Sequence, residues 1–172
     1  MLAMKIILEN GKIFDGFSPT KLLNDQLGEV VFNTGMTGYV ETLTDPSYQN
    51  QIIVFTYPLI GNYWVPAKKF WESKKIQVNG IIVGEACLTP SHPDSTLSLV
   101  EWANQQNIPI VTGVDTRALT KTLRQHGTMR GVITDKPKFS FQNIPTENQT
   151  ARISLTEPQM YGCGKKRIIA VD

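Results

Sequence analysis

The sequence predicts an α/β domain whose sheet is built first from antiparallel strands and then from strands that alternate with helices. Short runs rich in Val, Ile and Phe, at residues 29–33, 51–56 and 108–112, have the length and composition of strands. Residues 95–106 and 115–126 carry apolar side chains at helical spacing. Because strands and helices alternate in the second half, we expect a layered, mixed sheet with its helices largely on one side.

The composition is that of one ordinary globular domain. The 172 residues are 41% apolar and 19% charged, which provides enough apolar material for a core. The formal charge is only +2 and no basic stripe is visible, so nucleic acid is not an expected partner. No run approaches the ~20 apolar residues of a membrane span, and the start of the chain is not a signal peptide. We therefore expect a cytoplasmic protein that does not contact a membrane.

The first predicted unit is a β-hairpin. Residues 5–9 and 12–15 flank Asn10-Gly11, a pair that tolerates positive φ at both centres of a two-residue turn. Residues 17–27 contain a proline and several polar side chains. We expect them to form a loop that leads into strand 29–33.

Three further strands follow from apolar patterns. Residues 51–56 form a nearly continuous apolar run, which is typical of a strand buried on both faces. Residues 76–83 alternate between polar and apolar side chains, which predicts a strand. Residues 129–134 predict one more, after strand 108–112.

Two helices are expected among these strands. Ser95 can cap the first of them. Asp115 can cap the second, which would end at Gly127. Leu119 and Leu123 stand one turn apart in the second helix and are expected to face the sheet, with basic side chains on the other side.

The last part of the chain has a different character. Residues 136–165 lose all periodicity and contain three prolines, which is typical of a linker. Residues 167–172 then begin a new apolar strand. We expect a piece cut at the entrance of a second domain: a domain at 1–135, the linker, and the first strand of a missing domain at 166–172.

No nucleophile is paired with a base in the sequence. His92 and His126 are far apart and are expected to be a loop histidine and a helix-end histidine. Cys87 has the surroundings of a small buried hydrophobe, and Cys163 lacks the helix that a nucleophile elbow needs. The two cysteines fit neither a disulfide framework nor a zinc site, and the Walker and dinucleotide motifs are absent.

The most specific local feature is the corner Asp45-Pro46-Ser47-Tyr48. Asp at the first position and Pro at the second favour a tight type I turn, which would present the hydroxyl and backbone N–H of Ser47 outward. On the residues alone, two interpretations stay open. Ser47 either only completes the turn or holds a small polar ligand.

A long, ordered set of residues has the pattern of a known family. The set comprises residues 28–34, 36–39, 41, 43–48, 51–52, 56–58, 60–62, 115–117, 119–120, 123–124, 127 and 131. Together they closely resemble the small, glutamine-hydrolysing subunit of carbamoyl phosphate synthase. The resemblance covers residues 5–135.

This resemblance implies a subunit of two domains. The amino-terminal one would have a layered β/β/α swivelling architecture, and the carboxy-terminal one would be a class I glutamine amidotransferase domain with a Cys-His-Glu arrangement. Ammonia from glutamine would pass through a tunnel to a large synthetase subunit, the partner in a heterodimer. That large subunit would bind ATP and magnesium and make carbamoyl phosphate for pyrimidine and arginine synthesis. No cofactor is expected on this chain.

The resemblance assigns one site residue to this chain. Ser47 matches a family position that contributes to the glutamine site from the amino-terminal side of the domain interface. No catalytic residue and no metal ligand are expected, so the chain alone would be inactive. Residues 28–39 resemble the part that faces the large subunit. Trp64 stands where the family usually has glycine, so its loop is left out of the site.

Two other functions remain as alternatives. One is a non-catalytic protein-interaction scaffold with the same fold, and the other is a free-standing hydrolase that uses Cys163 and His126. A downstream Gly-x-Cys-x-Gly motif with later His and Glu would favour the amidotransferase over the scaffold. Inactivation by thiol alkylation would favour the hydrolase.

Overall fold

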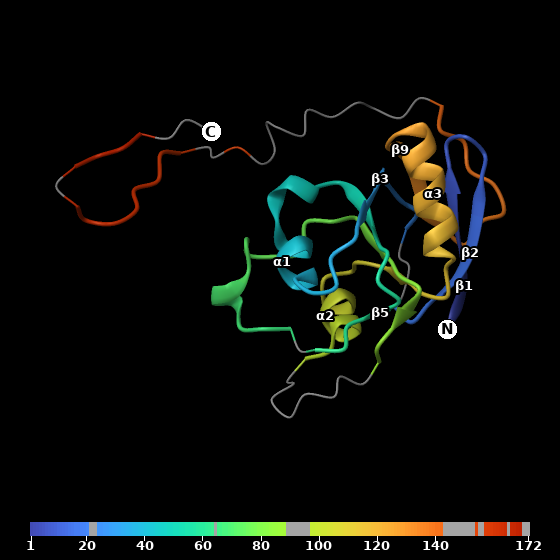
Figure 1. Ribbon diagram of the computed structural model, residues 1–172, viewed down its shortest axis with the longest axis horizontal. Helices are drawn as coiled ribbons and strands as arrows, with labels where there is room; N and C mark the ends of the chain where they lie inside the picture. The colour runs from blue at the N-terminus through green and yellow to red at the C-terminus, as the bar shows by residue number, and fades with distance from the viewer. Residues whose placement is uncertain are drawn as a thin grey trace.

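The computed structural model describes residues 1–20, 24–63, 65–88, 97–142, 154, 157–164 and 166–169. It is a mixed α/β fold in which few helices cover a large sheet (Figure 1). The strands are β1 (Leu2–Leu8), β2 (Ile13–Ser18), β3 (Gln26–Asn33), β4 (Gln51–Phe55), β5 (Leu59–Ile60), β6 (Gly80–Ile82), β7 (Glu85–Ala86), β8 (Ile110–Val111) and β9 (Met129–Thr134). The helices are α1 (Tyr39–Thr44), α2 (Leu99–Gln105) and α3 (Thr116–His126), with short 3-10 turns η1 (Pro46–Tyr48) and η2 (Lys68–Phe70).

Seven strands form one mixed sheet in the order β2-β1-β9-β3-β4-β6-β8. The neighbours β3, β4, β6 and β8 run parallel to one another, whereas β1 is antiparallel to both β2 and β9, and β9 is antiparallel to β3. Strands β5 and β7 make a separate parallel pair. The predicted mixed sheet is therefore confirmed, with an antiparallel hairpin first and parallel strands after it, but the last strand, β9, is antiparallel to both of its neighbours.

The two edges of this sheet meet. The backbone N–H groups of Phe17 and Thr112 each donate to the carbonyl of the other at 2.8 Å, which joins β2 to β8. Strands β6 and β9 are not neighbours, yet a Cβ atom placed on Gly80 would collide with Cδ1 of Ile133. The sheet therefore curls until β6 and β9 face each other, and it is nearly closed.

Buried apolar side chains form two clusters, one on each face of the curled sheet. The inner cluster comprises Met4, Ile6, Leu8, Val30, Ile52, Val54, Ile82, Val111, Val114, Leu119, Leu123, Met129 and Ile133. The outer cluster comprises Tyr39, Val40, Leu43, Ile53, Phe55, Ile60, Val65, Ile76, Val78, Ile81, Val83, Leu99, Trp102, Ala103 and Ile110. Strand β4 alternates between the two clusters and is buried on both faces, as its sequence predicts.

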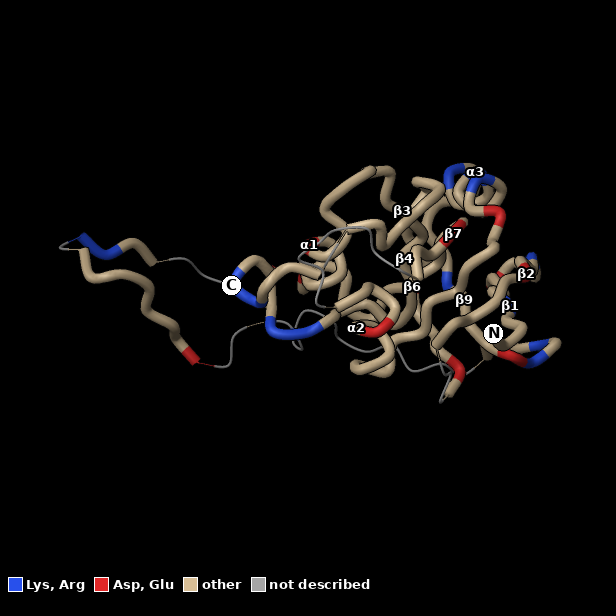
Figure 2. Tube along the Cα trace, turned by 90° about the horizontal axis from the view of Figure 1, so that it is seen from below, with Lys and Arg blue, Asp and Glu red and all other residues tan. Residues whose placement is uncertain are grey.

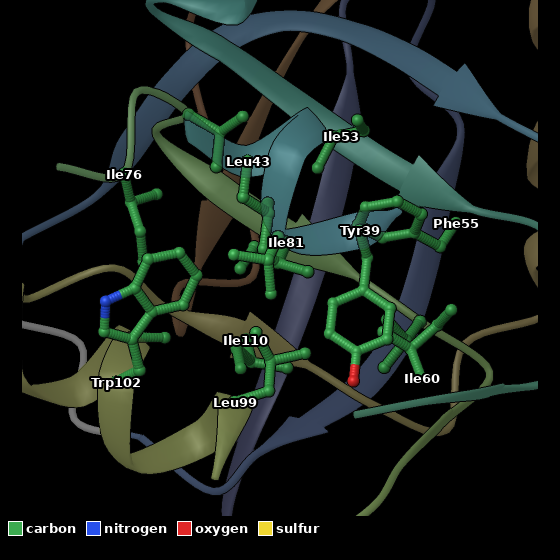
Figure 3. Packing of buried hydrophobic residues seen from close by; sticks show 14 of the residues in the cluster. Tyr39, Leu43, Ile53, Phe55, Ile60, Ile76, Ile81, Leu99, Trp102 and Ile110 are labelled. Atoms are coloured by element: carbon green, nitrogen blue, oxygen red, sulfur yellow. The ribbon is translucent and has the colours of Figure 1, made fainter. Parts of the chain in front are cut away.

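Helices α1 and α2 cover the outer face of the sheet. Figure 3 shows Tyr39 and Leu43 of α1 and Leu99 and Trp102 of α2 packed over the strand residue Ile81. Helix α3 contributes instead to the inner cluster, through the side chains predicted to face the sheet. The expectation that the helices lie largely on one side holds for α1 and α2 but is wrong for α3.

Helix α3 has the predicted start and end. The Asp115 carboxylate accepts a hydrogen bond from the Ala118 N–H at 2.9 Å, and Gly127, with φ of +83°, follows the last helical residue. Helix α2 starts later than the sequence analysis proposed. Its cap is Ser98, which forms a capping box with Glu101, and Ser95 lies outside the described residues.

The hairpin between β1 and β2 turns differently from the prediction. The Gly11 N–H donates to the Leu8 carbonyl, and the Leu8 N–H donates to the Lys12 carbonyl, both at 2.9 Å. Gly11 has φ of +83°, whereas Asn10 does not have a positive φ. The connection is thus a three-residue loop with a left-handed glycine at its end, and the predicted two-residue turn is wrong.

Several predicted boundaries also change. Strand β6 is shorter than the predicted strand 76–83, because residues 76–79 are buried or half-buried without joining the sheet ladder. The predicted loop 17–27 loses residues to β2 at one end and to β3 at the other. Residues 166–169 carry no assigned strand, and Ile168 and Ile169 are exposed. No helix within the described ranges is both long and apolar enough to cross a bilayer.

Candidate functional site

The Asp45–Tyr48 corner is a tight turn, as predicted. The Tyr48 N–H donates to the Asp45 carbonyl at 3.1 Å, and η1 follows directly on Asp45. The Asp45 side chain accepts a hydrogen bond from the Ser47 N–H at 2.8 Å. Proline at the first position of η1 has a fixed φ, and it has no backbone N–H that would need an acceptor. The corner is therefore held by its own backbone and by one carboxylate.

The two groups that Ser47 was expected to present differ in availability. Its N–H is already bonded to Asp45, so the sequence-based expectation of an outward N–H is wrong. The Ser47 side chain is exposed, and its hydroxyl has no hydrogen-bond partner among the residues that the structure describes. The hydroxyl can both donate and accept. Of the two groups expected to bind a ligand, the hydroxyl is therefore the one that is not already bonded.

Thr44, the residue before the corner, fixes the end of α1. It is fully buried, and its Oγ1 donates to the Val40 carbonyl at 2.9 Å. The same oxygen accepts from the Glu72 N–H at 3.0 Å, and the Thr44 carbonyl accepts from Ser73 Oγ at 2.5 Å. A segment nearly thirty residues away thus satisfies the Thr44 carbonyl, one of the backbone groups that a helix end leaves without partners. The corner is anchored on a rigid support.

A tyrosine from a distant loop caps the other end of α1. Gly38, with φ of +78°, stands before the helix and has no side chain to cap it. The Tyr63 hydroxyl accepts hydrogen bonds from the Gly38 N–H at 2.7 Å and from the Tyr39 N–H at 3.1 Å. It fills the capping role that a serine or aspartate usually has.

Tyr39 and Tyr63 form a reciprocal pair. Their rings stack with centroids 4.0 Å apart. The Tyr39 hydroxyl donates to the Tyr63 carbonyl at 2.7 Å and accepts from the Tyr63 N–H at 3.2 Å. Burial raises the pKa of both phenols above the ordinary tyrosine value, more than the hydrogen bonds between them lower it. Both hydroxyls stay protonated at neutral pH, so the pair holds structure rather than moving protons.

Replacing Tyr63 by phenylalanine is expected to lower the free energy of unfolding by about 1 kcal/mol, because two helix N–H groups lose their acceptor. The amides of Gly38 and Tyr39 should exchange with solvent faster, as measured by hydrogen exchange. Tyr161→Phe is the matched control, since that ring is 83% exposed, and it should change neither quantity. Unchanged protection at both amides would show that the hydroxyl does not cap α1.

Residues 6–133 match the family described as carbamoyl-phosphate synthase small chain, CPSase domain. The chain belongs to this family. It is 47% identical over 160 residues to the carbamoyl phosphate synthase small chain of Caldanaerobacter subterraneus subsp. tengcongensis, covering 92% of this chain and 44% of that protein. It is 46% identical over 167 residues to the arginine-specific small chain of Bacillus subtilis, covering 97% of this chain and 46% of that protein.

The chain spans less than half the length of these two relatives. Among solved structures, it matches an aminopeptidase from Aneurinibacillus sp. strain AM-1 with a TM-score of 0.38 and 13% identity, over 78% of this chain and 30% of that one. A likeness this low carries no argument about the carbamoyl phosphate synthase domain. Family membership therefore rests on the sequence matches alone.

Among the described residues of this synthase-family chain, His126 and Cys163 lie in separate segments. His126 lies in the last turn of α3, where its Nδ1 is 2.9 Å from the Thr122 carbonyl. Cys163 is exposed in the segment 157–164, which extends away from the end of the fold that holds α3 (Figure 1). Cys87 is half-buried, and His92 and Trp64 lie outside the described residues. No group of three potential metal ligands occurs in the part of the chain that the structure describes.

Two features of the site were missed from the sequence. Nothing local to Tyr63 indicates that its hydroxyl reaches a helix twenty-five residues earlier. The contacts of Glu72 and Ser73 with Thr44 are equally remote. The sequence of residues 68–75, which contain both, is ambiguous and predicts no element there.

Proposed function

We propose that this chain is the amino-terminal part of the small subunit of a glutamine-dependent carbamoyl phosphate synthase, a ligase. The observation that carries the proposal is the family match over residues 6–133, supported by relatives whose names state the small chain. In this proposal residues 1–135 form a layered domain of the swivelling type, 136–165 are a linker, and 166–172 begin a glutamine amidotransferase domain. The subunit works in the cytoplasm.

The proposed role of the chain is structural and not catalytic. It docks the large synthetase subunit in a heterodimer and borders the glutamine site, while a downstream domain hydrolyses glutamine and ammonia is channelled to the large subunit. The carbamoyl phosphate that the large subunit makes feeds pyrimidine and arginine biosynthesis. One supporting point is the name of the Bacillus subtilis relative, which is arginine-specific.

Ser47 is the proposed contact to glutamine. Its exposed hydroxyl on a rigid corner can bond a polar group of the substrate with little loss of conformational entropy. The interaction scaffold remains the alternative, and the complete reading frame discriminates between them through the presence or absence of a Gly-x-Cys-x-Gly motif.

The test is kinetic and uses the product of the complete reading frame together with the large subunit. Ser47→Ala is expected to raise the KM for glutamine by about three- to tenfold, the loss of one ordinary hydrogen bond. Synthesis from free ammonia should not change, because that route bypasses glutamine. Ser140→Ala, another exposed serine, is the control and should leave both routes unchanged.

The same assay tests the division of labour. Residues 1–172 alone should show no glutaminase turnover, and appreciable turnover by this piece would refute the proposal. An unchanged glutamine KM in Ser47→Ala, with normal activity of the parent, would remove Ser47 from the site without affecting the assignment of the subunit.

A further inference from the structure

A short segment before β6 concentrates the positive charge of the chain. Residues 66–75, called the lysine loop here, contain Lys68, Lys69, Lys74 and Lys75 with a single glutamate. Four lysines and one glutamate give the loop a formal charge of +3, whereas the whole chain carries +2. All four lysines are exposed. The residues outside the loop carry a formal charge of −1 (+2 minus +3), so the loop is a locally positive surface on a nearly neutral chain.

The lysine loop is held rigidly from within. The Trp71 ring packs on Trp102 of α2 with centroids 4.8 Å apart. The Trp71 Nε1–H donates to the Pro66 carbonyl at 2.8 Å, which closes the loop on itself. Together with the contacts of Glu72 and Ser73 to Thr44, these interactions fix both sides of the loop. The lysines therefore project from an ordered backbone. A partner can bind them without the entropy cost of ordering the loop.

The lysine loop lies beside the Ser47 corner. Its anchor, Thr44, is the residue immediately before that corner. Figure 1 shows the loop at one end of the folded body next to α1 and α2, and Figure 2 shows its basic residues at the end opposite α3. The loop and the proposed glutamine contact thus share one support, the end of α1.

The chemistry of the loop selects an acidic protein surface. Its cations are lysines, which are compact point charges, and it has no arginine to grip a phosphate or a base with two parallel hydrogen bonds. Trp71 packs on Trp102, which leaves Phe70 as the one exposed ring of the loop, with the Lys69 ammonium 4.9 Å from its centroid. Binding to single strands of nucleic acid uses free aromatic faces on which bases stack. The patch is also short, whereas a nucleic-acid backbone is tracked over a long stripe.

We propose that the lysine loop is a docking surface for a cluster of Asp and Glu side chains on the large synthetase subunit. This inference rests on the proposed function, which supplies the large subunit as partner. Exposed lysines around one aromatic side chain, 57% exposed in Phe70, give such an interface a charged rim and a small apolar contact. The principal effect of the charges is on the association rate and its dependence on salt.

Charge reversal tests the loop in the product of the complete reading frame. Lys68→Glu with Lys69→Glu, and separately Lys74→Glu with Lys75→Glu, should each weaken binding to the large subunit by about tenfold at about 50 mM salt. The difference from the parent should shrink at about 300 mM salt, where charges are screened. The second pair makes no ring contact that the structure describes, so it separates charge from packing.

The control is Arg117→Glu with Lys121→Glu on the exposed face of α3, at the other end of the fold. It removes as much positive charge and should change the affinity by no more than about twofold. Normal binding by both loop variants would overturn the inference and leave the proposed function standing. Failure of the parent protein to bind the large subunit would overturn both. Binding of duplex DNA by the parent, lost in the loop variants alone, would assign the loop to nucleic acid instead.

Discussion

Trp102→Ala is expected to lower the free energy of unfolding by about 3–5 kcal/mol, the usual cost of removing a large buried aromatic side chain. Trp102 is 1% exposed and lies between α2 and the sheet (Figure 3). Its ring is also the support on which Trp71 packs. The substitution therefore opens a cavity in the outer cluster and loosens the lysine loop at once. Urea denaturation followed by circular dichroism measures the loss.

Trp102→Phe gives a graded comparison at the same position. The indole Nε1 is buried without a hydrogen-bond partner in the described part of the chain, so phenylalanine removes an unsatisfied donor as well as some volume. Its cost should be less than half that of Trp102→Ala. Phe70→Ala, at an exposed ring, should cost less than about 0.5 kcal/mol. A cost below about 1 kcal/mol for Trp102→Ala would show that the ring does not support the outer cluster.

Gly80→Ala is expected to lower the free energy of unfolding by about 1–3 kcal/mol, because the interior of the curled sheet has no room for a methyl group at this position. The new Cβ would collide with Cδ1 of Ile133. That side chain is itself fully buried within the inner cluster, so it cannot simply turn aside. Thermal or denaturant unfolding of the single variant measures the effect.

A second substitution identifies the cause of that loss. Ile133→Val removes the atom that the new methyl group would meet, and alone it should cost about 0.5–1.5 kcal/mol. The double variant Gly80→Ala/Ile133→Val should therefore be more stable than the sum of the two single effects predicts. Strict additivity would mean that β6 and β9 do not face each other across the interior.

Periodicity predicted the existence of most elements because it reports burial directly. In β4 the buried residues alternate between the inner and the outer cluster, and the apolar run of the sequence indicated this. The same logic failed at residues 76–79. Ile76 and Val78 are buried at alternate positions, yet the Gln77 N–H donates to the Leu43 carbonyl of α1 rather than to a strand. Alternating burial therefore does not establish strand pairing.

Local chemistry explains two further differences between expectation and structure. Asn10-Gly11 occurs in both two-residue and three-residue hairpin loops, and strand register decides between them. The register pairs Ile7 with Ile13, which leaves the longer loop. For α2, the sequence contains Ser98 three residues before Glu101, the signature of a capping box. That signal indicates the later start, whereas the predicted cap was Ser95.

The candidate site was predictable where its contacts are local. Asp45 and Pro46 indicated a rigid turn, and the structure has one. The engagement of the Ser47 N–H by the Asp45 carboxylate is an equally local bond, available from the side-chain chemistry of aspartate. The support from Tyr63 and Ser73 could not be foreseen, because it depends on loops that only the folded chain brings to α1.

The position of β9 dictates when this domain can be completed during synthesis. Strand β9 lies between β1 and β3, so the earlier hairpin and the parallel strands share no ladder until it is inserted. Before residues 129–134 leave the ribosome, the Phe17 to Thr112 bridge is the sheet contact between these two halves that the described residues provide. Closure of the curled sheet is therefore a late step for the nascent chain, set by strand order rather than by the speed of any local element.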